Sequence, residues 1–169
     1  NFPSCPSGPN MIWSDCIGSY TGVDGSKYVG AFRDNKKHGK GTWSRSDLGV
    51  FAGEYRNDVA SGMGTWALPN GDIFTGEFEN DVYDGKGALT YADGTTYVGG
   101  WRKEQRHGFG MWRHFSGDTF AGEYRNNKKN GLGKFTFKDG TIREGFWEND
   151  EFKIGMKISP ASLKGFCPD

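Results

Sequence analysis

A glycine-centred motif that returns every 23 residues constrains the fold of this chain more than any other feature. The motif consists of an aromatic residue, any residue, glycine, any residue and a second aromatic residue. It begins at Tyr28, Phe51, Phe74, Tyr97 and Phe120. A Gly-x-Gly pair follows nine residues after each central glycine, and turn dipeptides such as Asn70-Gly71 keep the same phase in most repeats. Three markers with one period indicate a repeat array, in which each unit packs on its neighbours.

Each repeat has the pattern of a β-hairpin. Tyr97, Gly99 and Trp101 alternate with residues of the opposite face, which is strand periodicity. A second short strand follows and ends at Asn-Gly or Asp-Gly, where we expect a two-residue hairpin turn. Each hairpin would advance the sheet by roughly 10 Å. The sequence therefore predicts an all-β fold, an elongated single-sheet antiparallel meander of about six hairpins, twisted or curled into an open trough.

Aromatic residues must supply most of the core. Among 169 residues the chain has 28 glycines and 15% aromatic residues, whereas Leu, Ile and Val are scarce. Repeat-equivalent rings should form ladders, and ring pairs add about 0.5–1.5 kcal/mol beyond area burial. The first ladder is Tyr28, Phe51, Phe74, Tyr97 and Phe120, the second is Phe32, Tyr55, Phe78, Trp101, Tyr124 and Trp147, and the third is Trp43, Trp66, Leu89, Trp112 and Phe135.

The pattern resembles the MORN (membrane occupation and recognition nexus) repeat, most closely in "YVGAFRDNKKHGKGTW" and "YVGGWRKEQRHGFGMW". We predict an N-terminal cap segment over 1–14, a repeat array over 15–152 and a C-terminal cap or tail over 153–169. The array would comprise a partial repeat 15–27, the repeats 28–50, 51–73, 74–96, 97–119 and 120–142, and a degenerate unit 143–152. Members of the family have varied roles, so the resemblance implies a fold more than a function.

The cysteines lie outside the full repeats. Cys5 and Cys16 bracket a short loop, and a disulfide between them would cap the open first edge of the sheet; free thiols are the alternative. "CPSG" followed by "CIG" is similar to extracytoplasmic bacterial MORN proteins with a Cys-capped start. With the absence of Met at Asn1, which a trimmed chain would also show, this favours a secreted or periplasmic location over a cytoplasmic one.

The far end of the chain carries Cys167, which we expect to be free or paired with another chain. Ser159 and Pro160 could start a short capping helix.

Charge excludes some partners. Lys plus Arg is 21 and Asp plus Glu is 21, so nucleic acid is not an expected partner. A basic loop patch of Arg106, Lys128 and Lys129 leaves anionic lipid as an alternative, although solvated loop charge explains these residues as well. No apolar run reaches the roughly 20 residues that a membrane-spanning helix needs.

Catalytic and metal-binding constellations are not expected. His38 and His107 lie three repeats apart, roughly 30 Å along the meander, too far for one metal site. Glu54 and Glu77 would be about 10 Å apart, but on the face opposite the rings, where ion pairs or hydrogen bonds explain them better than catalysis. We therefore predict no enzymatic activity, no cofactor and no metal.

The ladders are either purely structural or also a binding surface. As a surface, a trough of Tyr and Trp rings suits an extended peptide or a glycan. The chain is predicted to be a non-catalytic scaffold for a protein partner or for a second copy of itself in a homodimer, with a glycan or anionic lipid as alternatives. The predicted binding residues are Tyr28, Phe32, Tyr55, Phe78, Tyr97, Trp101, Trp112 and Tyr124.

Overall fold

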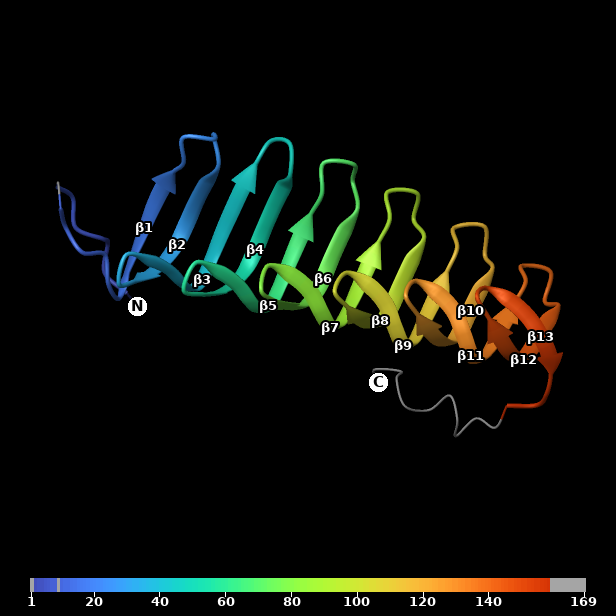
Figure 1. Cartoon of the computed structure of the whole chain (residues 1–169). Coiled ribbons are helices and arrows are strands. Elements are labelled where there is room, and N and C mark those ends of the chain that lie inside the picture. The colour runs from blue at the N-terminus through green and yellow to red at the C-terminus, as the bar shows by residue number, and fades with distance from the viewer. Residues whose placement is uncertain (1, 9, 159–169) are drawn as a thin grey trace. The chain divides into compact units, whose positions relative to one another are not determined.

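The computed structural model describes residues 2–8 and 10–158, and in this part of the chain it contains thirteen β-strands and no helix (Figure 1). The chain divides into two units, Asn1–Val82 and Tyr83–Asp169. The strands of the first unit are β1 (Cys16–Thr21), β2 (Lys27–Arg33), β3 (Lys36–Arg45), β4 (Gly49–Arg56), β5 (Val59–Ala67) and β6 (Ile73–Glu79). Those of the second are β7 (Val82–Thr90), β8 (Thr96–Arg102), β9 (Gln105–Arg113), β10 (Thr119–Arg125), β11 (Lys128–Thr136), β12 (Ile142–Glu148) and β13 (Glu151–Gly155).

The strands pair antiparallel in chain order within each unit, β1 through β6 and β7 through β13. First and last strands of a unit do not pair, so the sheet is open and not a barrel. The predicted all-β meander of hairpin repeats is confirmed. Since antiparallel neighbours need only short connections, a 23-residue period suffices for two strands and two turns.

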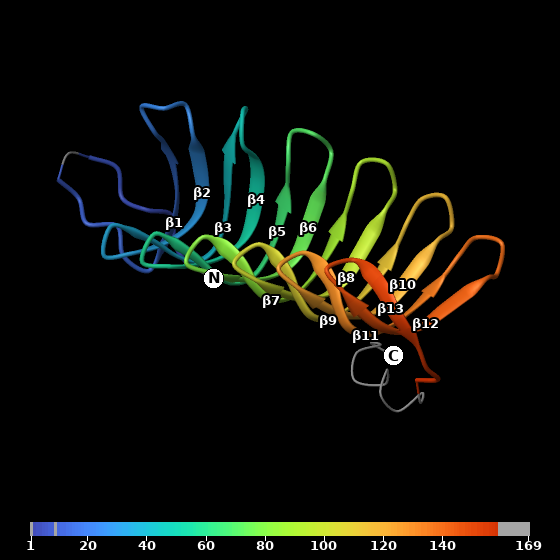
Figure 2. The ribbon, with the colours of Figure 1, turned by 45° about the vertical axis from the view of Figure 1, so that its right-hand side comes forward.

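Each hairpin bends where the Gly-x-Gly pair lies. Between β2 and β3, Gly30 pairs with Gly41 and Phe32 with Lys37, so Ala31 alone faces the three residues 38–40. The same register shift recurs in β4–β5, β8–β9 and β10–β11. A bulge bends the strand and increases its twist, which explains the curvature of the strands between two rows of turns (Figures 1 and 2).

The tight turns are not where the sequence analysis put them. The Asn70-Gly71 dipeptide lies in a three-residue loop, closed by bonds from Leu68 N–H to Asp72 O (2.9 Å) and from Gly71 N–H to Leu68 O (3.1 Å). The predicted two-residue turn was wrong there because Gly71, at φ 92°, follows a type I turn as a third loop residue. Two-residue turns, with positive φ at both positions, occupy Asp34-Asn35, Asn57-Asp58, Asn80-Asp81, Lys103-Glu104, Asn126-Asn127 and Asn149-Asp150.

These turns also join neighbouring repeats. Asp58 Oδ1 accepts a hydrogen bond from Lys37 N–H (2.8 Å), and Asp58 N–H donates to Lys37 O (2.9 Å). The carboxylate thus binds the backbone of the preceding repeat. The same pair of bonds links Asp81 to Ala60, Asn127 to Arg106 and Asp150 to Lys129.

The core of each unit is a zigzag of edge-to-face rings. In the first unit Tyr55 contacts Tyr28 (centroids 5.1 Å apart) and Phe51 (5.4 Å), and the rings are nearly perpendicular. In the second unit Tyr124 contacts Tyr97 (5.2 Å) and Phe120 (5.4 Å) in the same way. The first two predicted ladders therefore interleave into one row, because edge-to-face contact is the geometry that aromatic quadrupoles favour.

An N-terminal segment covers one edge of the first unit. Cys5 and Cys16 form the predicted disulfide, and Ile17 exchanges backbone hydrogen bonds with Pro3 and Cys5 (both 2.8 Å). Trp13 adds its ring edge-to-face to Phe32, with centroids 4.8 Å apart. The segment thereby satisfies backbone groups of β1 that would otherwise form an exposed edge. The predictions for Cys167 and for a helix at Ser159 and Pro160 lie outside the described residues.

Candidate partner-binding surface

The structure places most of the predicted binding rings in the core. Tyr97 has no exposed surface, and seven of the eight predicted residues are buried, with Phe32 the most exposed at 7%: Tyr28, Phe32, Tyr55, Phe78, Tyr97, Trp101 and Tyr124. Trp112 alone is half-buried. Direct contact of these rings with a partner stays a prediction, and the side chains beside them have the accessible surface.

Among the ladder rings, the accessible ones that point to the same face as the core belong to the third predicted ladder. Trp43 and Trp66 in the first unit, and Trp112 and Phe135 in the second, are half-buried; we call these four residues the outer rings. Each is the cross-strand partner of a core ring, as Trp43 is of Tyr28, and cross-strand partners share one face of a sheet. Leu89, at the equivalent position, is buried.

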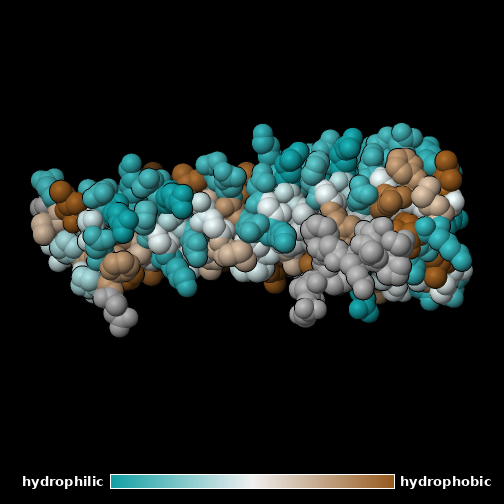
Figure 3. All heavy atoms as spheres, turned by 90° about the horizontal axis from the view of Figure 1, so that it is seen from below, coloured by the Kyte–Doolittle hydropathy of each residue, from teal (hydrophilic) through white to brown (hydrophobic). Residues whose placement is uncertain are grey.

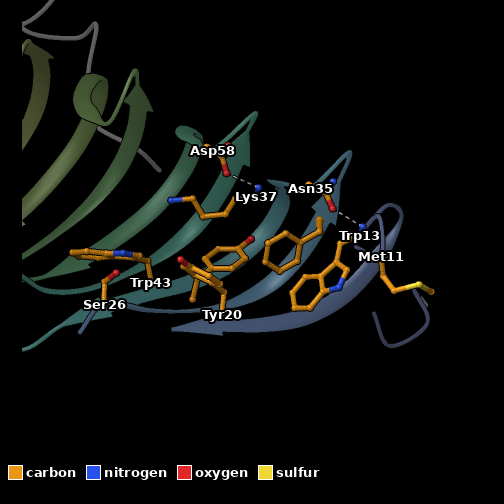
Figure 4. A pocket seen from close by; sticks show the side chains of 10 residues that line it. Met11, Trp13, Tyr20, Ser26, Asn35, Lys37, Trp43 and Asp58 are labelled. Atoms are coloured by element: carbon orange, nitrogen blue, oxygen red, sulfur yellow. Dashed lines mark hydrogen bonds between the residues drawn. The ribbon is translucent and has the colours of Figure 1, made fainter. Parts of the chain in front are cut away.

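A pocket of 370 Å³ in the first unit lies beside Trp43 (Figure 4). A second pocket, of 190 Å³, shares Trp43 and Lys37 with it, and we call the two together the aromatic groove. Trp43 and Trp13 lie at opposite ends of the first pocket, with Tyr20 between them and Lys37 and Asp58 on the far wall (Figure 4). Its accessible lining is thus aromatic with a few polar groups, as is usual for ligand sites.

Lys37 lies over the core rings at this wall. Its ammonium nitrogen is 5.7 Å from the ring centroid of Tyr28 and 5.0 Å from that of Tyr55, distances at which a cation is attracted to an aromatic face. Burial, with a smaller contribution from Asp58, raises the pKa of Tyr28 to about 12. The phenol is therefore neutral at physiological pH, and it donates its hydrogen bond to Ala31 O (3.0 Å).

The predicted basic patch does not assemble as one outward surface. Arg106 and Lys129 line a common pocket of 410 Å³ in the second unit. Lys128 is exposed and adjacent to Lys129 in β11, so the two side chains point to opposite faces. The structure brings two of the three cations together and separates the third from them.

The other polar candidates serve the framework. Glu54 lines a shallow depression with glycines and threonines, and Glu123 Oε1 accepts from Leu132 N–H (3.3 Å). The Nδ1 atoms of His38 and His107 are buried without a hydrogen-bond partner. Residues 2–8 and 10–158 contain no group of three or more His, Cys, Asp or Glu side chains placed to hold a metal ion. The same residues include no helix long and apolar enough to span a membrane.

Sequence reasoning did not single out the concave position that Lys37, Arg106 and Lys129 share. The signal was present, because these residues differ by multiples of 23 and occupy the same place in their repeats. Trp13 was also missed, since it lies in a segment without the repeat pattern. Only coordinates show that its ring extends the core zigzag.

The fold and surface define a class of protein, the all-β hairpin-repeat proteins with an aromatic core. The MORN repeat family model matches residues 28–50, 51–73, 74–96, 97–119 and 120–142, and the chain belongs to this family. The MORN repeat is a non-catalytic repeat type that serves as a scaffold for protein or membrane interaction.

A comparison with curated proteins found no match. Among solved structures, the SAS-4 (dCPAP) TCP domain of Drosophila melanogaster, in complex with a proline-rich motif of Ana2 (dSTIL), is similar at 14% identity and a TM-score of 0.40. The alignment covers 85% of this chain and 95% of that one.

Proposed function

We propose that this chain is a non-catalytic scaffold that binds an extended segment of a protein partner in the aromatic groove of its first unit. The supporting observation is the groove itself, two adjoining pockets of 370 and 190 Å³ that share Trp43 and Lys37. The core rings beneath are already packed, so the half-buried outer rings offer apolar area without unfolding the unit. Trp anchors in preformed pockets dominate the binding energy of many interfaces.

The test is partner capture with matched variants on the two faces of the sheet. Trp43→Ala removes the ring common to both pockets, whereas Met63→Ala changes an exposed residue of the glycine–threonine depression. Partners captured by the wild-type chain and identified by mass spectrometry should be lost with Trp43→Ala and retained with Met63→Ala. Equal capture by both variants, with unchanged circular dichroism, would contradict the proposal. Light scattering over a concentration series separates a foreign partner from a homodimer.

A glycan chain is the second candidate, favoured by the equivalent placement of Trp43 and Trp66 one repeat apart. Two strand spacings amount to about 10 Å, similar to the two-sugar repeat of an extended β-linked glycan. Quenching of tryptophan fluorescence by oligosaccharides, insensitive to salt, would support this candidate over a protein partner. Anionic lipid has no comparable support, because Arg106 and Lys129 line a pocket and Lys128 lies on the other face.

We also propose that the chain works in an oxidising compartment, outside the cytoplasm. The support is the Cys5–Cys16 disulfide, since such bonds persist mainly in secreted and periplasmic proteins. Alkylation of the protein from its natural source, without reductant, should leave both thiols unmodified. Quantitative alkylation of Cys5 and Cys16 would contradict this location.

A further inference from the structure

The second unit has a pocket of different character from the aromatic groove. It measures 410 Å³, and Arg106 and Lys129 line it together with Trp112, His114, Asp93 and Asp150; we call it the cationic pocket. Each cation is the second residue of the second strand of its hairpin, Arg106 in β9 and Lys129 in β11, one repeat apart. The repeat geometry therefore points both side chains to the same concave face.

The two cations rest on rings. The guanidinium carbon of Arg106 is 5.6 Å from the ring centroid of Tyr97 and 5.2 Å from that of Tyr124. The ammonium of Lys129 lies 4.9 Å from the centroid of Trp147 and 5.0 Å from that of Phe135. Half-burial lowers the pKa of Lys129, an effect that Asp150 opposes and Arg106 reinforces. Desolvated charges of this kind gain more from a bound anion than solvated ones do.

The two carboxylates of the pocket are engaged with the backbone. Asp150 Oδ1 accepts from Lys129 N–H (2.9 Å), and Asp93 Oδ1 accepts from Thr95 N–H (2.8 Å). Among the described residues, no ion pair joins either carboxylate to Arg106 or Lys129. Arg106 uses one N–H group, on Asn127 O (2.8 Å). Most donors of the two cationic heads are thus available to an incoming acceptor.

A surface of aromatic rings lies beside these donors. The indole of Trp112 stacks on His114, with centroids 5.4 Å apart and planes 30° apart, and lies 6.2 Å from Phe135. His114 is held in turn by Ser116 Oγ, 2.7 Å from its Nδ1. A ligand that places a negative group on the cations would therefore bring its neighbouring atoms onto a ring surface.

We propose that the cationic pocket binds an acidic residue of an extended peptide, whose carboxylate enters between Arg106 and Lys129 while an adjacent apolar or aromatic side chain lies on Trp112. This inference rests on the proposed protein-binding function and assigns a second subsite with its own specificity. The argument for this occupant is local charge complementarity, since neither cation forms an ion pair within the described residues and both pocket carboxylates are bonded to backbone N–H groups.

A peptide carboxylate fits the pocket better than a phosphate group does. Asp93 and Asp150 contribute two negative charges to the lining and oppose the two cations. A phosphate monoester carries about −1.5 to −2 charge at pH 7, and its additional charge gains no net attraction from a lining in which two cations and two carboxylates balance. Membrane headgroups would in addition have to enter a concave pocket.

The test is a displayed library of random peptides, selected on the whole wild-type chain and on an Arg106→Gln, Lys129→Gln variant. Peptides enriched on the wild type should carry Asp or Glu beside an aromatic or aliphatic residue, and the variant should not enrich them. A selected peptide should bind at least about tenfold more weakly to the variant, because charge-assisted hydrogen bonds are lost. Replacing its acidic residue by the amide should weaken binding to the wild type by a similar factor.

Two variants serve as controls. Lys128→Gln removes a cation of the opposite face and should bind like the wild type, and Lys129→Arg keeps the charge and should retain most of the affinity. Circular dichroism and thermal melting of the double variant establish that it is folded.

Three results would overturn the inference. These are enriched peptides without acidic residues, equal binding by the double variant, and stronger binding of phosphatidylserine vesicles or inorganic phosphate than of any selected peptide. The proposed function depends on Trp43 in the other unit. Loss of partner capture with Trp43→Ala would therefore still support that function if this inference failed.

Discussion

At the scale of residues, ring packing explains the glycines of the repeat. Gly41 lies directly opposite Gly30, and the ring of Tyr28 covers both, so a Cβ on Gly41 would overlap the phenol oxygen and two ring carbons. Tyr97 covers Gly110 in the same way. The aromatic-x-Gly motif and the Gly-x-Gly pair therefore contribute to the same contact, although they lie apart in the sequence.

A half-buried histidine, His107, makes stability depend on pH. Burial lowers the pKa of His107 below its usual 6.5, with smaller contributions from Arg102 and Arg125 that outweigh Asp84. Between the lowered pKa of the folded state and 6.5, the folded state then binds fewer protons than the unfolded state. The contribution of His107 is complete above that pH and is lost as pH falls through the folded-state pKa.

We expect the free energy of unfolding in urea to decrease as the pH falls below 6.5, and His107→Asn to flatten this dependence. Asn is the residue at the equivalent position Asn130, so the substitution suits the repeat. Asp24, whose pKa is lowered to about 2 by hydrogen bonds from Ser26 and Arg45, titrates below this window. An equal slope in the variant would show that another group is responsible.

At the scale of elements, the two-residue turns differ in how well their residues suit them. Lys103 and Glu104 have φ of 47° and 63°, a left-handed conformation that costs ordinary residues roughly 1–2 kcal/mol each. The equivalent turns use Asn and Asp, which tolerate it better.

Replacing Lys103-Glu104 by Asn-Gly should therefore raise the free energy of unfolding by about 1–2 kcal/mol, measured by urea denaturation. Asp81→Gly is the matched control. There the side chain accepts a hydrogen bond from Ala60 N–H (2.7 Å), so losing it should offset or exceed the gain from glycine. A double variant no more stable than the wild type would show that the turn is not strained.

The turns also show how far sequence reasoning reaches. The 23-residue period and the alternation in segments such as 97–101 predicted the strands and their order, because strand periodicity is local. The tight turns were misplaced, since Asn-Gly is a strong hairpin signal and pairs such as Asn57-Asp58 contain no glycine. The interleaving of two ring rows depends on the bulge at Gly-x-Gly, whose bend the sequence pattern does not encode.

The same limit applies to the binding surface. The sequence identified the aromatic residues but assigned binding mainly to the first and second ladders, which the structure buries, and to Trp112 alone of the third ladder. Which ladder stays accessible depends on strand curvature. Arg106 and Lys129 line one pocket because of the direction in which the adjacent side chains of β11 point. That direction could be assigned only once the exact strand register was known.

At the scale of the whole molecule, the disulfide stabilises one end of the array. It closes a loop with a sequence separation of 11 and holds the segment that exchanges backbone hydrogen bonds with β1. In a Cys167→Ser background, where only this pair can oxidise, reduction should lower stability by about 3 kcal/mol.

Hydrogen exchange is the measurement with the required resolution. Amides of β1 should exchange faster on reduction, while those of β8 and β9 in the other unit should not change. Cys5→Ser should behave like the reduced chain and be insensitive to reductant. Uniform acceleration in both units, or none in β1, would contradict a local capping role.

The hydrogen bonds that join each tight turn to a strand of the preceding repeat have a consequence beyond stability. Lys37, Ala60, Arg106 and Lys129 occupy one position in four of the repeats, and each has its main-chain N–H group held by the turn of the next repeat. The bond is made to the backbone, so it does not depend on the side chain that the position carries. At this position the backbone is fixed by a hydrogen bond while the side chain can vary. The binding specificity of the concave face could therefore be redesigned one repeat at a time.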